Sequence, residues 1–343
     1  LEPRELTSFI LKGSFSSTGI NEQTLTIRAG FLLNDQFIKQ AESSVVTDVI
    51  SAALTFHLIV SGSTVDQTVN LGDTMRVSVD YANTSGEKLD GLSFALKLAG
   101  MNGKKVPIVW SRADLGAGIR EGETVRWKTV ATDAGIFDLS LPLAVELVPV
   151  HDDRFTLVLS ATIGKIGSLE GVRTIESTPI TVSVNSDVDV RGEARWSDEE
   201  GNIVGSGPIP PTVGETTSYR IFWTINNDLH QLDRIRLEAI LPSSVSWMDQ
   251  KTAGAGTISF DPASRRVSWQ ISSLPVEASE VIATFDVSIT PNNADRGTTM
   301  KLVQSPTFEA IDAATRATLT RTLEAITTAL SNDEAASGKG VVQ

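Results

Sequence analysis

Residues 71–79 read LGDTMRVSV, and residues 213–221 read VGETTSYRI. Both stretches begin with an apolar residue, a glycine, an acidic residue and a threonine, so one pattern returns 142 positions further along the chain. Two further blocks keep this offset: Val125 and Trp127 return as Val267 and Trp269, and Val145, Leu147 and Pro149 return as Val287, Ile289 and Pro291. Self-similarity at a fixed period is typical of a repeated structural unit. The sequence therefore predicts two copies of one module.

Apolar and polar residues alternate through the repeated stretches. The apolar positions are Met75, Val77, Val79 and Tyr81 in the first copy, and Tyr219, Ile221, Trp223 and Ile225 in the second. A period of two places every second side chain on one face, as in a half-buried β-strand. Turn residues rich in Asn and Gly separate these strands. We therefore predict an all-β fold of tandem immunoglobulin-like antiparallel β-sandwiches.

Three of the six tryptophans are predicted to lie in the cores. Trp127 and Trp269 occupy equivalent strand positions between polar neighbours, and Trp223 belongs to an apolar alternation. Such positions are typical of aromatic side chains that are buried between two sheets.

Similar short segments close each module. Glu42-Ser-Ser-Val-Val-Thr resembles Glu176-Ser-Thr-Pro-Ile-Thr, and both resemble Leu323-Glu-Ala-Ile-Thr-Thr. We therefore predict four parts: the C-terminal part of an incomplete β-sandwich module at residues 1–50, immunoglobulin-like sandwiches at residues 51–185 and 186–331, and an extended C-terminal tail at residues 332–343. About fifty residues seldom stabilise an isolated half-sandwich. The missing strands must come from upstream sequence, which we favour, or from another chain.

The second copy carries further recognisable features. A Gly-acidic opening at Gly214 is followed by Leu241-Pro242, by Gly256-Thr-Ile-Ser-Phe-Asp and by Arg266-Val-Ser-Trp-Gln-Ile. This order resembles the bacterial "conserved repeat" domain of unknown function, which occurs in tandem on large cell-surface proteins. The final residues, TTALSNDEAASGKGVVQ, are similar to the terminal segment of surface proteins from candidate-phylum bacteria. The resemblance implies an extracellular, repeat-built protein at the cell surface, and it brings no catalytic residue with it.

Composition excludes several classes of function. The net charge is −13 and the pI is near 4.8, which argues against a nucleic-acid partner because such partners need basic patches. The chain has no cysteine, so disulfides, thiolate metal sites and cysteine nucleophiles are absent. No apolar run reaches the length of a membrane span. The first residues, LEPRELTSF, lack a signal-peptide pattern, so we expect the signal of an exported protein to lie upstream of this segment.

Acidic clusters offer the only candidate metal site. Asp187 and Asp189 lie where the two complete modules meet, and Asp198, Glu199 and Glu200 follow in the turn SDEEGN. Calcium prefers several carboxylate and carbonyl oxygens, so these five residues are calcium candidates. The alternative interpretation is that an acidic protein places carboxylates in its turns. We expect no other cofactor.

Two classes of function compete on this sequence. Catalysis is not expected, because no motif of a nucleophilic, metal or phosphate-binding site is present. The leading hypothesis is a non-enzymatic structural component of a bacterial cell surface, which forms a polymer or lattice and lends a strand from its tail to the next subunit. The second is an adhesin or carbohydrate-binding module that contacts glycans or other surface proteins; its candidate ligand-binding residues are Trp110, Trp196 and Trp247. An accessory region of a larger secreted enzyme is a third possibility.

Overall fold

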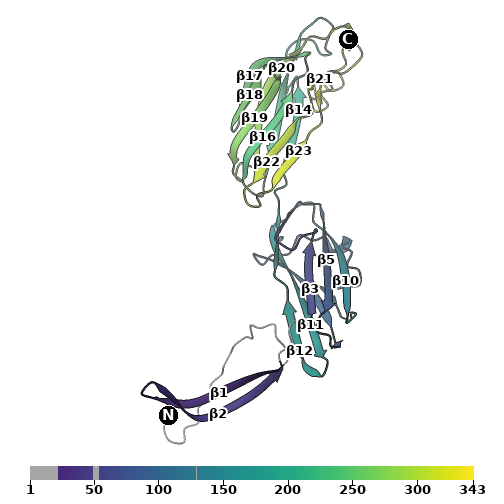
Figure 1. The fold of residues 1–343 in the computed structure, drawn as a ribbon. Coiled ribbons are helices and arrows are strands. Elements are labelled where there is room, and N and C mark those ends of the chain that lie inside the picture. Colours follow the sequence, from purple (N-terminus) through teal and green to yellow (C-terminus); the bar gives the residue numbers. More distant parts are fainter. Residues whose placement is uncertain (1–21, 49–53, 129) are drawn as a thin grey trace.

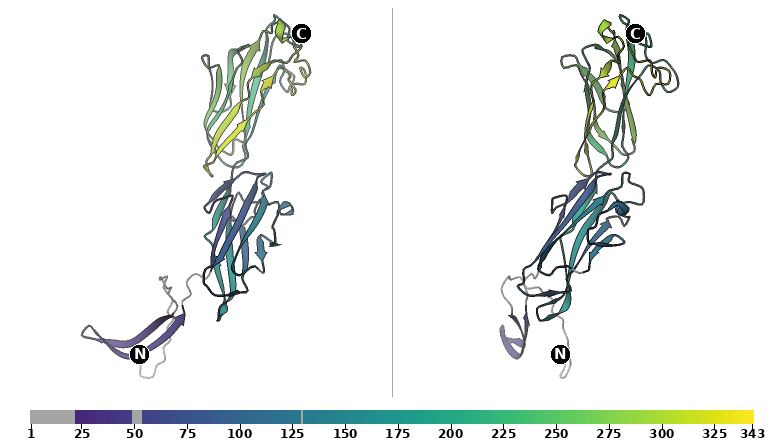
Figure 2. Two further views of the ribbon diagram at one scale, coloured as in Figure 1. Left: turned by 45° about the vertical axis from the view of Figure 1, so that its right-hand side comes forward. Right: turned by 90° about the vertical axis from the view of Figure 1, so that its right-hand side faces the viewer.

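The protein is built from β-strands. The computed structural model describes residues 22–48, 54–128 and 130–343, and these contain strands and two short 3-10 turns but no α-helix. The predicted all-β class with antiparallel sandwich sheets is confirmed. Two sandwiches follow one another along a common long axis, and a separate hairpin lies beyond the first of them (Figure 1). The two further views agree with this extended arrangement (Figure 2).

The first module has one sheet of three strands and one of eight. Its strands are β3 (Leu54–Val60), β4 (Gln67–Val69), β5 (Thr74–Asn83), β6 (Leu89–Asp90), β7 (Ser93–Gly100), β8 (Ile119–Glu121), β9 (Thr124–Trp127), β10 (Ala134–Pro142), β11 (Arg154–Ile166), β12 (Leu169–Glu176) and β13 (Ile180–Val184). The small sheet has the order β10-β5-β3, and the large sheet has the order β4-β13-β11-β7-β9-β8, with β12 and β6 also paired to β11.

The second module has sheets of four and five strands and a short two-stranded sheet. Its strands are β14 (Asp189–Arg195), β15 (Thr217–Asn226), β16 (Leu232–Ile240), β17 (Val245–Ala253), β18 (Thr257–Asp261), β19 (Arg266–Leu274), β20 (Glu280–Ile289), β21 (Lys301–Val303), β22 (Thr307–Asp312), β23 (Thr318–Thr322) and β24 (Ile326–Thr327). The orders are β14-β15-β20-β17, β18-β19-β16-β22-β23 and β21-β24. The first of these matches the A-B-E-D sheet of the immunoglobulin fold, and β16-β22-β23 matches its C-F-G strands.

Each module closes over its own apolar core. One core is formed by buried side chains between Leu54 and Val184, and the other by buried side chains between Val188 and Val342. The alternating residues of β5 and β15 supply the central contacts of each core, because their apolar faces point at the opposite sheet. The side chains of Trp127, Trp223 and Trp269 are all buried in these cores.

The first block of the repeat has the same backbone conformation in both modules, but the third block does not fall on equivalent strands. Gly72 and Gly214 both have positive φ, +79° and +84°, and the N–H of each donates to a carbonyl oxygen just beyond a strand end, Ala144 O after β10 and Pro291 O after β20. These acceptors are not 142 residues apart. Strand β10 ends at Pro142, and the Val145 side chain is 74% exposed. The predicted match of Val145, Leu147 and Pro149 to strand β20 is therefore wrong, because β9 ends at Trp127 whereas β19 continues beyond Trp269 to Leu274, so β10 begins earlier in the repeat than β20 does.

The segment at residues 332–343 is not an extended tail. It folds back on the second module, where Ala336 and Val342 are buried. The Val342 N–H donates to Thr298 O at 2.9 Å, and the Gln343 N–H donates to Pro211 O at 2.8 Å. The Asp333 carboxylate is buried and accepts hydrogen bonds from the N–H groups of Trp196 and Ser197 at 2.6 and 2.7 Å. The second module thus extends to residue 343 instead of ending at residue 331.

The N-terminal hairpin stands apart from both sandwiches. It consists of β1 (Glu22–Leu33) and β2 (Gln36–Asp48), which form a two-stranded sheet with no other partner among the described residues. Asn34 and Asp35 connect the strands with positive φ at both positions, which suits a tight two-residue turn. The predicted incomplete module at residues 1–50 falls partly on residues 1–21, 49 and 50, which lie outside the described residues.

Candidate functional site

The connection between the two modules is short, and hydrogen bonds hold its first two residues. Only residues 185–187 separate Val184 of the first core from Val188 of the second. Asn185 is buried; its N–H donates to Val69 O at 2.8 Å and its Nδ2 donates to Asn70 Oδ1 at 2.9 Å. These bonds tie Asn185 to the first module, and the Ser186 N–H, which donates to Asp312, ties the next residue to the second.

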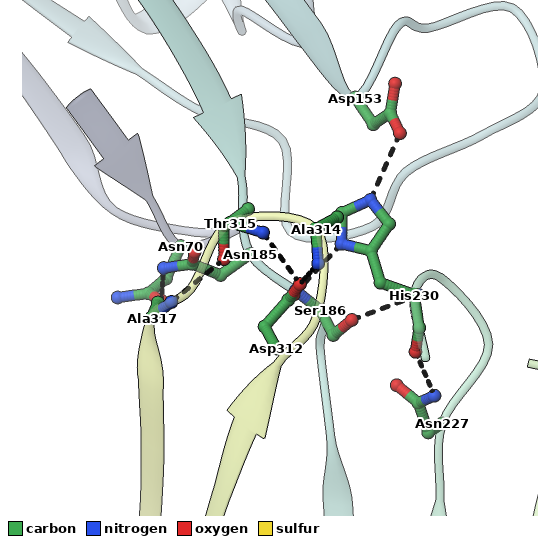
Figure 3. A network of polar contacts seen from close by, with 10 residues as sticks. All are labelled: Asn70, Asp153, Asn185, Ser186, Asn227, His230, Asp312, Ala314, Thr315 and Ala317. Carbon is green, nitrogen blue, oxygen red and sulfur yellow. Dashed lines mark hydrogen bonds and ion pairs between the residues drawn. The ribbon is translucent and has the colours of Figure 1, made fainter. Parts of the chain in front are cut away.

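Asp312 organises the second module's side of the junction (Figure 3). Its carboxylate is fully buried and lies at the end of β22. One oxygen accepts the N–H groups of Ala314 and Thr315 at 2.9 and 3.0 Å, which fixes the β22–β23 turn. The other oxygen accepts the N–H of Ser186, in the linker, at 2.8 Å and faces Nδ1 of His230 at 2.9 Å. Burial opposes ionisation of Asp312, but these hydrogen bonds outweigh it and hold its pKa far below the usual range.

His230 joins the two modules. It lies in the β15–β16 loop, its side chain is 13% exposed, and its Nε2 faces Asp153 Oδ2 of the first module at 3.2 Å. The loop is held by Asn227, whose Nδ2 donates to the His230 carbonyl oxygen at 2.6 Å, and by the His230 N–H, which donates to Ser186 Oγ. The hydrogen bond to Asp312 raises the pKa of His230; burial opposes this, and Asp153 adds to the rise.

An apolar contact accompanies the polar one. Leu229, the neighbour of His230, packs against the core of the first module although it belongs to the second. It lines a small recess together with Leu71 and Leu147 of the first module. The β15–β16 loop therefore docks through one apolar and one ionic side chain.

The structure disperses the predicted calcium ligands. Asp187 faces Arg321 at 3.8 Å and Asp189 pairs with Arg191 at 2.7 Å. In the turn SDEEGN, Asp198 accepts the N–H and Nδ2 of Asn202, and Glu199 pairs with Arg195, while Glu200 is exposed. Within the described residues no three His, Cys, Asp or Glu side chains are grouped to hold a metal ion. Four of the five carboxylates are already engaged by arginines or by Asn202, and the fifth, Glu200, is exposed.

The three candidate ligand-binding tryptophans lie in three different surroundings. Trp110 is half-buried; its Nε1 donates to Glu123 at 3.2 Å and the Arg120 guanidinium covers its ring at 4.4 Å. Trp196 packs against the core of the second module. Trp247 stacks between Phe260 and Phe285, with ring centroids 5.1 and 5.3 Å away. No pair of these rings forms an exposed platform, so no observation on them favours the carbohydrate-binding hypothesis.

The N-terminal hairpin carries an uncovered apolar face. The strand register places Leu25 beside Val45, Ile27 beside Ser43, Ala29 beside Ala41 and Phe31 beside Ile38 on one side. The Leu25, Phe31 and Val45 side chains are 48%, 51% and 56% exposed. The other side is polar in its middle, where Thr26 bonds to Ser44 at 3.0 Å and Arg28 pairs with Glu42 at 2.7 Å, and carries exposed apolar residues only towards its ends, at Leu32, Phe37 and Val46. An isolated hairpin with an open apolar face is marginal in water, and it has the amphipathic pattern of a half-sandwich.

The comparisons with known proteins do not assign the chain to a family. No family model and no curated protein matches it. Among solved structures, it is similar to a variant of BcpA, the major pilin subunit of Bacillus cereus, with a TM-score of 0.32 and 8% identity over 80% of this chain and 69% of that chain. A TM-score of this size does not establish a shared fold, and the "conserved repeat" family stays a prediction. No helix in the described part of the chain is long and apolar enough to cross a membrane.

Proposed function

We propose that this chain is a non-enzymatic structural segment of a bacterial cell-surface assembly, a filament or surface-layer subunit that self-associates through its N-terminal hairpin. The observation that carries the proposal is the apolar face of that hairpin, which no described residue of the chain covers. The tandem sandwiches fit the same role, because a short paired linker joins them into an extended rod (Figure 1).

The β11–β12 hairpin of the first module indicates what the N-terminal hairpin needs. Both have a long first strand of 12 or 13 residues and a tight turn, and Glu42 and Glu176 lie in similar sequence on their second strands. In β11 the inward side chains from Phe155 to Ile163 are fully buried by the rest of the module, and the outer edge pairs with β7. By this analogy β1 requires a strand along its edge and an apolar layer over its face.

We assign a second copy of this chain as the partner that covers the edge and the apolar face of the hairpin. The hairpin lies at one end of the long axis, away from both cores, so another molecule can reach its edges and its apolar face (Figure 2). An identical hairpin brings both a strand edge and a complementary apolar face, which is what an isologous contact needs. Both sandwiches of this chain are already closed over their own cores.

Charged substitutions on the apolar face should abolish this association. In Leu25→Asp/Val45→Lys, two neighbouring apolar side chains become polar; each buried side chain of this size contributes about 1.5–3 kcal/mol, so binding should weaken by about 100-fold or more. Sedimentation velocity over a concentration series measures this. The matched control, Thr26→Asp/Ser44→Lys, changes the opposite side of the same two strands and should retain association. Equal association of wild type and the Leu25/Val45 variant, or a wild type that stays monomeric over the whole concentration series, would overturn the assignment.

A further inference from the structure

The bridge at His230 needs both ring nitrogens as donors. Nδ1 faces a carboxylate oxygen of Asp312 and Nε2 faces one of Asp153, at 2.9 and 3.2 Å. An ionised carboxylate can accept hydrogen bonds but cannot donate them. A neutral imidazole has one N–H to donate, whereas an imidazolium has two. Both bonds can therefore exist together only when His230 is protonated.

The two bonds are not equally secure. Asp312 belongs to the same module as His230, is fully buried and is fixed by three backbone N–H groups. Asp153 belongs to the first module, its side chain is 36% exposed, and its bond to His230 is the longer one. When the ring loses its second proton, the remaining N–H stays with Asp312, and the bond between the modules is the one that is lost.

We propose that His230 is a pH-dependent latch that holds the second module against the first when its ring is protonated and lets the modules bend when it is neutral. Leu229 keeps its apolar contact in both states, so the neutral form loosens the junction without separating it. The inference is independent of self-association through the hairpin.

The charges around the ring favour the closed state. Besides Asp153 and Asp312, the recess that contains His230 is lined by Asp66 and by one cation, Arg154. On the opposite side of the loop lie further carboxylates, Glu146, Asp187 and Asp228. Among the residues that line these two recesses, carboxylates outnumber cations, and Arg321 lies outside them and faces Asp187 at 3.8 Å. This excess of negative charge favours the imidazolium.

The sign of the pH effect follows from the pKa shifts. The pKa of His230 is raised above its ordinary value of 6.5, so its contribution is fully present below that value and is lost as the pH rises through the raised pKa. The pKa of Asp312 is lowered, so its contribution is present above its ordinary value of 3.8 and is lost only at far lower pH. The latch is closed in mildly acidic solution and opens towards alkaline pH.

The distance between labels on the two modules tests the proposal. The chain lacks cysteine, so Ile136→Cys on β10 and Ile203→Cys in the second module, both exposed, introduce unique spin-label sites. The distance distribution should be narrow at pH 5.5 and should broaden with a midpoint above 6.5; NMR of the His230 ring should show both nitrogens protonated below that midpoint. These pH values are chosen around the ordinary histidine pKa of about 6.5.

Two variants and a control complete the test. His230→Gln should give a broad distribution at every pH, and Asp153→Ala, which removes the acceptor and leaves the second module unchanged, should broaden it at pH 5.5. His57→Gln removes an exposed histidine that pairs with Asp80 far from the junction, and it should behave as wild type. A wild-type distribution that does not respond to pH, or one that still narrows in acid in both junction variants, would refute the latch.

Discussion

Deleting residues 332–343 is expected to unfold the second module. The deletion removes the buried side chains of Ala336 and Val342 and exposes the core positions that they cover. It also removes the Asp333 carboxylate and so leaves the buried N–H groups of Trp196 and Ser197 without acceptors. A buried Val contributes about 1.5–3 kcal/mol and each orphaned donor costs about 1–3 kcal/mol, which together approach the whole stability of a domain.

Thermal unfolding followed by calorimetry measures this effect. The truncated chain should lose the transition of the second module and retain that of the first. A single substitution in this segment should have a smaller effect than the deletion. Asp333→Ala should lower the free energy of unfolding by about 2–4 kcal/mol. Glu334→Ala removes a carboxylate from the adjacent, exposed position and should change it by less than about 0.5 kcal/mol. Equal effects of the two substitutions would contradict the role assigned to Asp333.

The Asp333 contribution also has a predictable pH dependence. Burial opposes ionisation, but hydrogen bonds from Ser197 and Trp196 prevail and lower the pKa of Asp333. The stabilisation is present above the ordinary carboxyl pKa and is lost as the pH falls through the lowered value. The same contacts explain why the tail cannot serve as a strand donor between subunits: its release would cost the second module its fold.

The strands could be predicted from sequence because their signal is local. In β15 the apolar residues from Tyr219 to Ile225 alternate without interruption, and they are the residues that the fold buries. The tail gives no such signal. Its buried positions, Asp333, Ala336, Gly340 and Val342, do not keep a period of two. Asp333 and Val342 bond to residues far away in sequence, Trp196 and Thr298. A segment that packs through irregular turns looks like an extended tail until its distant partners are known.

The contacts of His230 at the junction could not be predicted from the sequence either, because its partners are also far away along the chain. A histidine in an Asn- and Asp-rich turn is typical of a solvated loop, and His230 meets Asp153 and Asp312 across 77 and 82 residues. The acidic residues near the boundary are numerous in the sequence and therefore indicate a metal site. In the structure, arginines close to them in the chain pair with Asp189 and Glu199.

Removing one core tryptophan should destabilise one module and spare the other. Trp269 is fully buried and its Nε1 donates to Ala255 O at 2.8 Å; Trp127, its counterpart in the repeat, stacks on Phe137 at 4.8 Å. Replacement of a buried Trp by Ala costs about 3–5 kcal/mol, which lowers the midpoint of a domain of this size by about 10 °C. Trp269→Ala should cost more than Trp127→Ala, because it also leaves a carbonyl group without its donor.

The two variants together measure how independent the modules are. Among the described residues, the two cores share no side chain other than the Leu229 contact. Calorimetry should therefore show that Trp127→Ala lowers only the transition of the first module and Trp269→Ala only that of the second. If either substitution lowers both transitions equally, the modules unfold as one cooperative unit. Repeating the measurement at alkaline pH separates the causes: coupling carried by the His230 bridge should disappear when the ring is neutral, whereas coupling carried by Leu229 should remain.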